Sequence, residues 1–336
     1  MQYYKQLDAL RFFSVLMVMI AHWVAWDTSN EFIRSFHWGN GVIFFFVLSG
    51  FLITEILYKQ KLEIEKGNSS FYSSLKNFYF RRTLRIFPIY YLLIIFLFFV
   101  NYKNTREIFP YLISYTSNIL QANTTSYVGD FNHFWSLAVE EQFYIFWPVC
   151  LLLIPKKHLL KFILVTITLS VISRMAFIYF MPDKWMAAGY LTNNVMFALG
   201  IGAMLAYFKQ EKTILFSKIS KSIWLTPFMI MFYLFSLFII AHHFPVSFMV
   251  FIFDEFVFCI LSAVIISRAV GNGYQFLGKI ILENKYLSHL GQISYGLYLY
   301  HLFAIPIFWD YISPALDLHS SKKITIWVSI TKCMPF

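Results

Sequence analysis

Long blocks of apolar residues follow one another along the chain, and short polar segments separate them. Each block holds about 16 to 21 residues, close to the ~20 that a helix needs to cross a bilayer. The pattern predicts nine membrane spans and an incomplete tenth from residue 323. The nine spans lie near residues 10–27, 41–58, 86–101, 134–154, 160–180, 190–208, 222–241, 248–268 and 290–310.

These spans predict an all-α, polytopic integral membrane protein with about ten transmembrane helices in one bundle. Residues 108–121 are apolar but too short for a crossing, which favours an interfacial or re-entrant segment. The longest polar connections, 59–85 and 102–133, are too short to form a separate soluble domain. We therefore expect one membrane domain over residues 1–336.

Composition and charge agree with this class. Hydrophobic residues make up 59% of the chain and charged residues only 13%, outside the range of soluble domains. The net charge of +10 comes from Lys and Arg that gather in alternate connections, which indicates topology and not nucleic-acid binding. The positive-inside rule places both termini in the cytoplasm. We expect no disulfide and no metal site, since Cys150, Cys259 and Cys333 lack the spacing for either.

Two ionisable residues stand on the first span, where such groups are costly and usually functional. Arg11 and His22 are eleven residues apart, so about three helical turns separate them by roughly 16 Å on one helix face. The span has no small-residue cleavage site, and we expect it to be retained as a helix. A cation near one surface and a base deeper in the bilayer suggest a reaction on a substrate that contacts both.

Three arginines precede the third span. Arg81, Arg82 and Arg85 are expected on one helical turn, an arrangement that suits phosphate groups. The alternative is a topology signal or a contact with anionic lipid headgroups.

The fourth span carries a polar face with a carboxylate. Glu140 and His22 both lie in the outer half by helix rise, about 9 Å and 7.5 Å below the outer ends of their spans, so we expect them to meet. A carboxylate beside a histidine can orient the ring and raise its basicity. The alternative is a structural pair that neutralises itself within the bundle.

Other polar residues are candidates for a substrate cavity. In the ninth span, Tyr298 and His301 share a polar stripe, although a hydrogen-bonded core histidine is the simpler interpretation. Ser49 in the second span and Glu141 beside Glu140 are further candidates, but small residues such as Ser49 commonly serve helix packing. Arg174 and the acidic residues near 254 are expected to serve charge pairing.

Six segments, taken together, resemble the acyltransferase family 3 of membrane proteins, which includes O-acetyltransferases of bacterial surface glycans. They run from residue 7 to about 303 and read LDALRFFSVLMVMIAHW, GVIFFFVLSGFLIT, FYFRRTLRIFPIYYL, FWSLAVEEQFYIFWP, FALGIGAMLAY and ISYGLYLYHLF.

The resemblance implies transfer of an acyl group, usually acetyl, from cytoplasmic acyl-CoA to a hydroxyl of a glycan such as lipopolysaccharide O-antigen or exopolysaccharide. It implies a bacterial cytoplasmic membrane location and contacts with membrane lipids. Arg11 and His22 match the family's first-helix pair, Arg82 and Arg85 its Arg-x-x-Arg pair, and Glu140 the glutamate of its W-S-L-x-x-E block.

In the simplest mechanism, His22 removes the proton of the acceptor hydroxyl and Glu140 stabilises the imidazolium. A covalent acyl-enzyme relay is the alternative. A transporter or flippase for a lipid-linked glycan is the competing function, because intramembrane charges also mark transport pathways.

The end of the sequence departs from the family pattern. The tenth span stops at ITIWVSITKCMPF, one to two turns short of a crossing and without the usual Glu-x-Pro segment. We expect an incomplete last helix. The esterase-like domain that some members carry is also missing from the sequence, so an extracytoplasmic acyltransferase partner would be a separate protein. Acceptor contacts are expected from residues 28–40 and 102–133.

Overall fold

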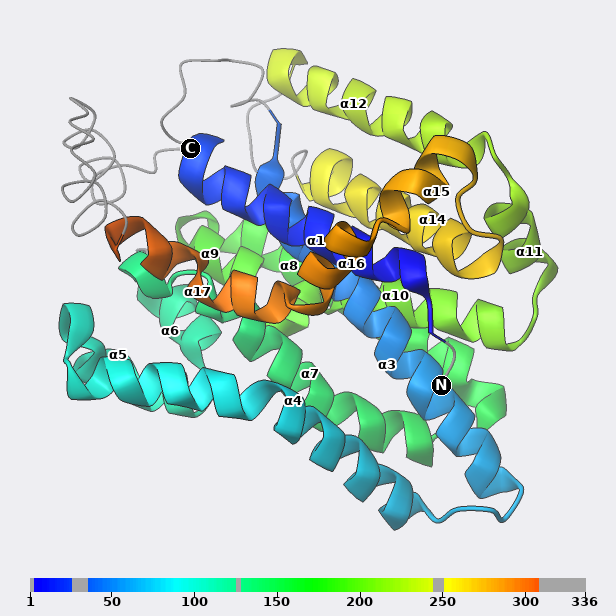
Figure 1. Ribbon diagram of the computed structural model, residues 1–336, viewed down its shortest axis with the longest axis horizontal. Coiled ribbons are helices and arrows are strands. Elements are labelled where there is room, and N and C mark those ends of the chain that lie inside the picture. Colours follow the sequence, from blue (N-terminus) through cyan, green and yellow to red (C-terminus); the bar gives the residue numbers. More distant parts are fainter. Residues whose placement is uncertain (1–2, 26–35, 125–127, 244–250, 308–336) are drawn as a thin grey trace. The chain divides into compact units, whose positions relative to one another are not determined.

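The computed structural model describes residues 3–25, 36–124, 128–243 and 251–307, and every regular element within these ranges is a helix (Figure 1). The longer helices are α1 (Lys5–Ile20), α3 (Gly41–Glu65), α4 (Phe71–Phe99), α7 (Phe134–Leu153), α8 (Leu159–Phe180), α10 (Thr192–Gln210), α12 (Leu225–His243), α14 (Val257–Gly271) and α17 (Ser294–Ile307). The shorter helices are α5 (Thr105–Ile113), α6 (Ser117–Thr124), α9 (Trp185–Tyr190), α11 (Ile214–Lys221), α15 (Phe276–Leu282) and α16 (Lys285–Gln292).

Several single turns connect or extend these helices. Two of them are π-helical, η1 (Ala21–Ala25) and η7 (Phe251–Phe256). The others are the 3-10 turns η2 (Trp38–Asn40), η3 (Tyr102–Asn104), η4 (Gly129–Phe131), η5 (Lys156–His158) and η6 (Pro182–Lys184). π-Helical turns are rare and are found mostly at functional sites.

Within the part of the chain that the structure describes, five helical segments are long and apolar enough to cross a membrane: Lys5–Ala25, Trp38–Glu65, Phe71–Phe99, Gly129–Leu153 and Lys156–Phe180. Three bent pairs of helices raise the number to eight if each pair is one span. The prediction of an all-α membrane-spanning protein is therefore confirmed. The number of about ten spans stays a prediction, and the tenth span from residue 323 lies outside the described residues.

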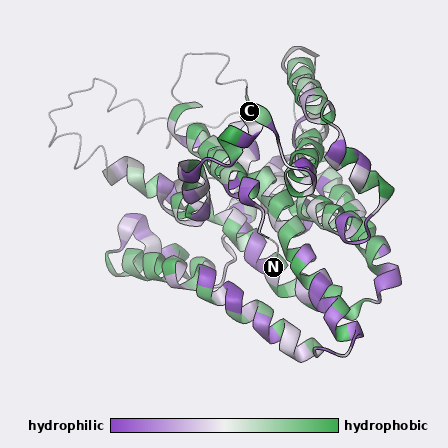
Figure 2. Ribbon diagram, turned by 45° about the vertical axis from the view of Figure 1, so that its right-hand side comes forward, coloured by the Kyte–Doolittle hydropathy of each residue, from purple (hydrophilic) through white to green (hydrophobic). Residues whose placement is uncertain are grey.

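Apolar side chains on the surface of the long helices support the membrane assignment. Apolar residues run along most of these helices (Figure 2). On α4, Leu92 is 69% and Phe96 60% exposed, and on α8 Leu169 is 60% exposed. Such faces would be unfavourable in water and are expected in contact with lipid chains.

Packing divides the chain into two compact units, which we describe separately. Of the described residues, unit 1 comprises 46–124 and 133–217, and unit 2 comprises 3–25, 36–45, 128–132, 218–243 and 251–307. The expected single domain stays a prediction.

In unit 1, α3 and α10 cross at glycines. A Cβ atom at Gly50 would lie 1.9 Å from the Leu199 carbonyl oxygen, and one at Gly202 would lie 1.9 Å from the Val47 carbonyl oxygen. Only glycine allows the two backbones to approach this closely. Gly50 in the second predicted span therefore serves helix packing.

In unit 2, α1 packs along α16 and α17. A Cβ atom at Gly291 would lie 1.7 Å from the Asp8 carbonyl oxygen, so α16 contacts α1 through bare backbone. The side chain of Gln6 adds hydrogen bonds to the Tyr274 backbone and to Glu283 at the same end of α1. The first span is thereby anchored where its polar residues begin.

Two predicted boundaries are wrong. Residues 59–85 were expected to connect two spans, but α3 extends to Glu65 and α4 already begins at Phe71. The Ser70 hydroxyl caps α4 by accepting a hydrogen bond from the Ser73 amide at 3.1 Å. The three arginines therefore lie well inside α4, and their expected place on one helical turn is confirmed.

The ninth predicted span, 290–310, is also wrong as one continuous helix. The chain leaves helical geometry at Ile293, so α16 ends at Gln292 and α17 begins at Ser294. Residues 108–121, predicted to be too short to cross, fall in α5 and α6, which are separated by a turn.

Candidate active site

The first polar centre lies at the start of α1. Arg11 forms an ion pair with Asp8, one turn earlier. Asp8 is only 2% exposed, and it also accepts hydrogen bonds from the Tyr3 hydroxyl at 2.6 Å and the Gln292 amide at 3.3 Å. A buried carboxylate thus holds the Arg11 guanidinium. Sequence reasoning missed Asp8, although opposite charges three residues apart on a helix could have indicated the pair.

The second polar centre joins two histidines. His22 lies in the π-helical turn that follows α1, and its Nδ1 atom is 2.8 Å from Nε2 of His301 on α17. The ring centroids lie 5.0 Å apart and the ring planes differ by 28°, as for two imidazoles that meet edge to edge through this contact. The Trp23 indole donates a hydrogen bond to the His301 carbonyl at 3.1 Å, which holds the two segments together. His301, which the sequence offered as a cavity residue or a core histidine, is a direct partner of His22.

The hydrogen bonds define which ring nitrogen carries the proton in the neutral pair. Nδ1 of His301 lies 2.6 Å from the Tyr298 carbonyl oxygen, which can only accept, so this nitrogen is protonated. Nε2 of His301 must then accept the proton of His22 Nδ1. The lone pair of His22 is consequently on Nε2, which has no hydrogen-bond partner among the described residues. A nitrogen in this state can act as a base or as a nucleophile.

Helices α16 and α17 contact the polar residues at the two ends of the first span. Asp8 bonds with Gln292 of α16, and His22 bonds with His301 of α17. The two helices that continue the ninth predicted span thus orient both ends of the Arg11–His22 pair. Tyr298 is buried and contributes its carbonyl to this arrangement.

The third polar centre lies in unit 1, between α3, α4 and α7. Glu140 Oε1 accepts a hydrogen bond from the Ser49 hydroxyl at 2.6 Å. The Tyr144 hydroxyl donates to Ser49 Oγ at 3.3 Å, and the Arg82 guanidinium lies 4.5 Å from the Tyr144 ring centre. Ser49 therefore orients a carboxylate in addition to its place in the α3 packing. The cluster connects the arginine helix with Glu140 through two side chains.

The remaining predicted residues of unit 1 differ in their surroundings. Arg81 and Arg85 are exposed on α4, whereas Arg82 is half-buried. The three arginines share one helix, as predicted, and Arg82 lies over the Tyr144 ring. Glu141 is 8% exposed and joins none of these bonds.

The predicted contact between His22 and Glu140 stays a prediction. The two residues belong to different units, and each is described here by the partners within its own unit.

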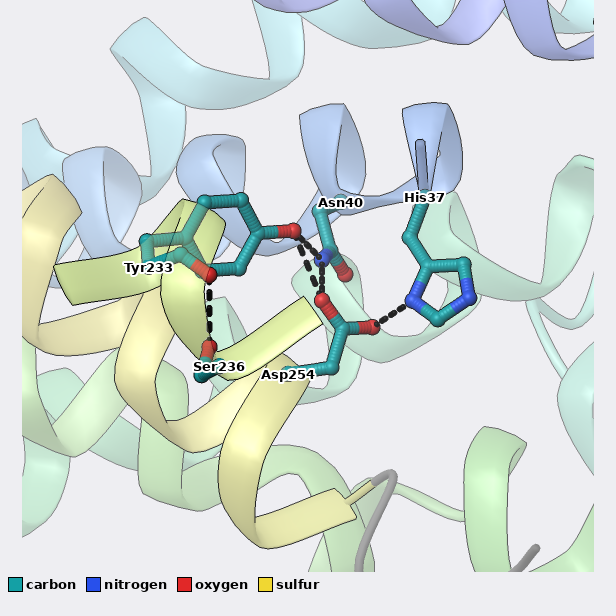
Figure 3. Close-up of polar contacts among 5 residues, drawn as sticks. All are labelled: His37, Asn40, Tyr233, Ser236 and Asp254. Atoms are coloured by element: carbon teal, nitrogen blue, oxygen red, sulfur yellow. Dashed lines mark hydrogen bonds and ion pairs between the residues drawn. The ribbon is translucent and has the colours of Figure 1, made fainter. Parts of the chain in front are cut away.

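A fourth polar centre, which sequence reasoning missed, surrounds Asp254 at the start of the α14 segment (Figure 3). Asp254 Oδ2 lies 2.6 Å from Nδ1 of His37, and Oδ1 accepts hydrogen bonds from the Asn40 amide at 2.6 Å and the Tyr233 hydroxyl at 2.7 Å. Arg174 places its guanidinium 5.8 Å from the Phe197 ring centre within unit 1. Its expected pairing with an acidic residue stays a prediction.

Comparisons with known proteins identify the family of the chain. The chain matches the family described as "Acyltransferase domain" over residues 4–331, nearly its whole length. The chain therefore belongs to this family of membrane acyltransferases, as its six sequence segments predict.

Several relatives of the chain are named as O-acetyltransferases. The chain is 30% identical to the "Peptidoglycan O-acetyltransferase OatA" of Listeria monocytogenes, over 98% of this chain. It is 27% identical to the "Putative peptidoglycan O-acetyltransferase YrhL" of Bacillus subtilis and 29% identical to a "Putative O-acetyltransferase" of Staphylococcus aureus, over 93% of this chain in both cases. Each match covers 52% of the relative, so the chain spans about half the length of these proteins. No solved structure matches the chain significantly.

Proposed function

We propose that the chain is a membrane O-acetyltransferase that moves an acetyl group from cytoplasmic acetyl-CoA to a hydroxyl of a cell-surface glycan. Membership of the acyltransferase family supports the reaction class. The observation that carries the site is the hydrogen-bonded series from the Tyr298 carbonyl through His301 to His22, because it leaves a lone pair on His22 Nε2.

The proposed step is a direct transfer. His22 Nε2 removes the proton of the acceptor hydroxyl, and the hydroxyl oxygen forms a bond with the thioester carbonyl carbon. The bond between that carbon and sulfur then breaks, and the coenzyme leaves as a thiolate that takes up the proton. His301 shares the positive charge that His22 carries for part of this cycle. In a covalent relay, the same lone pair would attack the thioester first.

The donor is proposed to bind at the arginines of α4. Arg81 and Arg85 are exposed, and a guanidinium group pairs well with phosphate oxygens. Glu140 is proposed to stabilise the positive charge of the His22 imidazolium during the reaction. The variant Glu140→Gln would keep the hydrogen bond with Ser49 and remove the negative charge.

The acceptor is proposed to be peptidoglycan. Two of the relatives carry peptidoglycan in their names, which favours this glycan over lipopolysaccharide O-antigen or exopolysaccharide. The alternative of a transporter or flippase receives no support from these names. We further propose a location in the bacterial cytoplasmic membrane with the N-terminus in the cytoplasm, in line with the positive-inside rule. A separate extracytoplasmic acyltransferase is a proposed partner.

The test combines a cell-wall measurement with a binding measurement. In a deletion host, the wild-type gene should restore acetyl signals in the NMR spectrum of the purified glycan, and His22→Ala should not. Purified protein of both forms should bind labelled acetyl-CoA equally. Acetyl signals that are the same with and without the gene would contradict the proposal, and a lack of acetyl-CoA binding would favour a transporter.

A further inference from the structure

The centre around Asp254 contains a histidine that the proposed reaction does not use. His37 precedes the turn η2, and its ring contacts Asp254 through Nδ1 at 2.6 Å. Asp254 is itself held by Asn40 and Tyr233, and the Asn40 amide also donates to the Tyr233 hydroxyl at 2.9 Å. Figure 3 shows the His37 ring with one nitrogen toward the carboxylate and the other turned away from it.

The carboxylate is fully committed to this arrangement. Asp254 is 3% exposed, and a buried carboxylate is stable only where donors surround it. Both of its oxygens are bonded, one by His37 and the other by Asn40 and Tyr233. The donors come from two segments, η2 with the preceding His37 and α12, so the position of the His37 ring is well determined. Such an orienting carboxylate is common behind histidines that bind or activate another group.

The outer edge of the His37 ring is accessible. The side chain is 39% exposed, and no described residue bonds with its Nε2 atom. Beside it, a Cβ atom at Gly39 would meet nothing within 4 Å, so the backbone there is open. Phe36 and Trp38, the residues before and after the histidine, are half-buried, and their ring centroids lie 4.5 Å apart. An accessible imidazole next to an aromatic pair suits a ligand that has both hydroxyl groups and apolar C–H faces, as a sugar ring does.

This surface lies at the same end of the first span as His22. The turn η2 packs against the π-helical turn η1, which carries His22, and against α1. All of these elements belong to unit 2. A sugar bound at His37 would therefore lie near the proposed reaction centre.

We propose that His37 binds a hydroxyl group of the acceptor sugar through Nε2, with Asp254 as the positioning residue. The inference rests on the proposed function, because the sugar is the acceptor of that reaction. A hydroxyl group fits either protonation state of the ring, since it donates to a neutral Nε2 and accepts from a protonated one. The binding therefore holds across the physiological pH range.

The charges around His37 determine its titration. Burial lowers the pKa of His37, but the hydrogen bond with Asp254 and the negative charges of Asp254 and Glu255 outweigh this effect, so the pKa is raised. Tyr233 is the other titratable group at the site, and its hydroxyl bonds with Asp254. An anionic ligand would bind only to the protonated ring and would weaken as the pH rises, whereas a hydroxyl group would not.

Two substitutions separate ligand binding from structural support. In His37→Asn, the side-chain amide can replace Nδ1 toward Asp254, but nothing replaces Nε2. In His37→Gln, the longer amide can replace Nε2, but the bond with Asp254 is lost. With the purified full chain in nanodiscs, acetyl-CoA as donor and a muropeptide fragment of peptidoglycan as acceptor, we expect His37→Asn to raise the acceptor KM roughly tenfold. His37→Gln should raise it less.

The opposite order, with His37→Gln impaired and His37→Asn like the wild type, would show a purely structural role and overturn the inference. Thermal unfolding of each variant reports on folding, and His289→Gln, at an exposed histidine on α16, is the matched control with no expected effect. If a variant fails to fold, Tyr233→Phe replaces it, and an unchanged acceptor KM in that variant would also overturn the inference. Acetyl-CoA binding should be the same in the wild type and in all variants. If the wild type itself did not bind acetyl-CoA, the proposed function would be contradicted, and the result would say nothing about His37.

Discussion

His22 and His37 both present a free Nε2 atom among the described residues of unit 2, but different groups orient them. Behind His22 stands a neutral imidazole, His301, which in turn bonds with a backbone carbonyl. Behind His37 stands the carboxylate of Asp254. An imidazole partner specifies the proton position without storing a positive charge, whereas a carboxylate stabilises the protonated ring. His22 is thus suited to accept a proton and release it quickly, and His37 is suited to hold a ligand.

The largest expected effect comes from removing the free nitrogen of His22. His22→Ala should lower the rate of acetyl transfer by roughly 10²- to 10⁴-fold, the usual contribution of a general base. Acetyl-CoA binding should stay the same, because the proposed donor site on α4 is unaltered. Radiolabelled transfer to a muropeptide measures the rate. If His37→Asn lowered the rate as much as His22→Ala does, the proposal that His22 acts as the base and His37 only binds the acceptor would be wrong.

A smaller effect is expected at the partner of His22. His301→Phe removes the acceptor for the Nδ1 proton, so the His22 ring can adopt the unproductive tautomer, and kcat should fall roughly 10- to 100-fold, as for other groups that orient histidines. His301→Gln keeps an oxygen acceptor and should retain most of the activity. Equal losses in both variants would mean that His301 acts through packing and not through its hydrogen bond.

A third variant tests the support of Asp254. Tyr233→Phe removes one of the two hydrogen bonds to Oδ1 and leaves the Asn40 bond in place. One net hydrogen bond is worth about 1 kcal/mol, so the acceptor KM should rise only a few-fold while kcat stays constant. Steady-state kinetics with varied muropeptide separates the two constants. A change confined to kcat would place Asp254 in the chemical step.

The smallest expected effect is a pH dependence of stability. Because the pKa of His37 is raised in the folded state, its pairing with Asp254 stabilises the fold fully below the ordinary histidine value near 6.5 and is lost as the pH rises through the raised pKa. Asp254→Asn should therefore flatten the slope of unfolding temperature against pH above about pH 6.5. The effect is small because the ring is partly exposed to solvent. If the slope of unfolding temperature against pH persisted in Asp254→Asn, a titratable group other than His37 would be its cause.

The sequence was sufficient for the membrane class and for individual polar positions. Arg11, His22 and Glu140 stood out because ionisable residues are rare within apolar blocks, and local spacing was enough to find them. The same reasoning could not identify their partners. His22 and His301 are separated by 279 positions, and His37 and Asp254 by 217, so only the fold brings them together.

The hydropathy pattern also failed to predict two helix boundaries and one polar centre. The arginine-containing turn of α4 is polar, so its helical start at Phe71 was hidden, although the Ser70 cap is a recognisable signal. The interruption at Ile293 falls inside an apolar stretch whose proline, Pro306, lies several turns further on, so proline does not mark it. His37 was hidden for a similar reason, since it lies just outside an apolar block and no residue near it in sequence suggests a carboxylate partner.

The central claim is that the lone pair of His22, oriented by His301, carries acetyl transfer. The most direct measurement follows labelled acetyl groups from acetyl-CoA to a muropeptide with purified wild-type protein, His22→Ala and His301→Gln in nanodiscs. The account predicts transfer by the wild type and by His301→Gln, and a rate roughly 10²- to 10⁴-fold lower in His22→Ala, with equal acetyl-CoA binding in all three. Transfer by His22→Ala at the wild-type rate would contradict it.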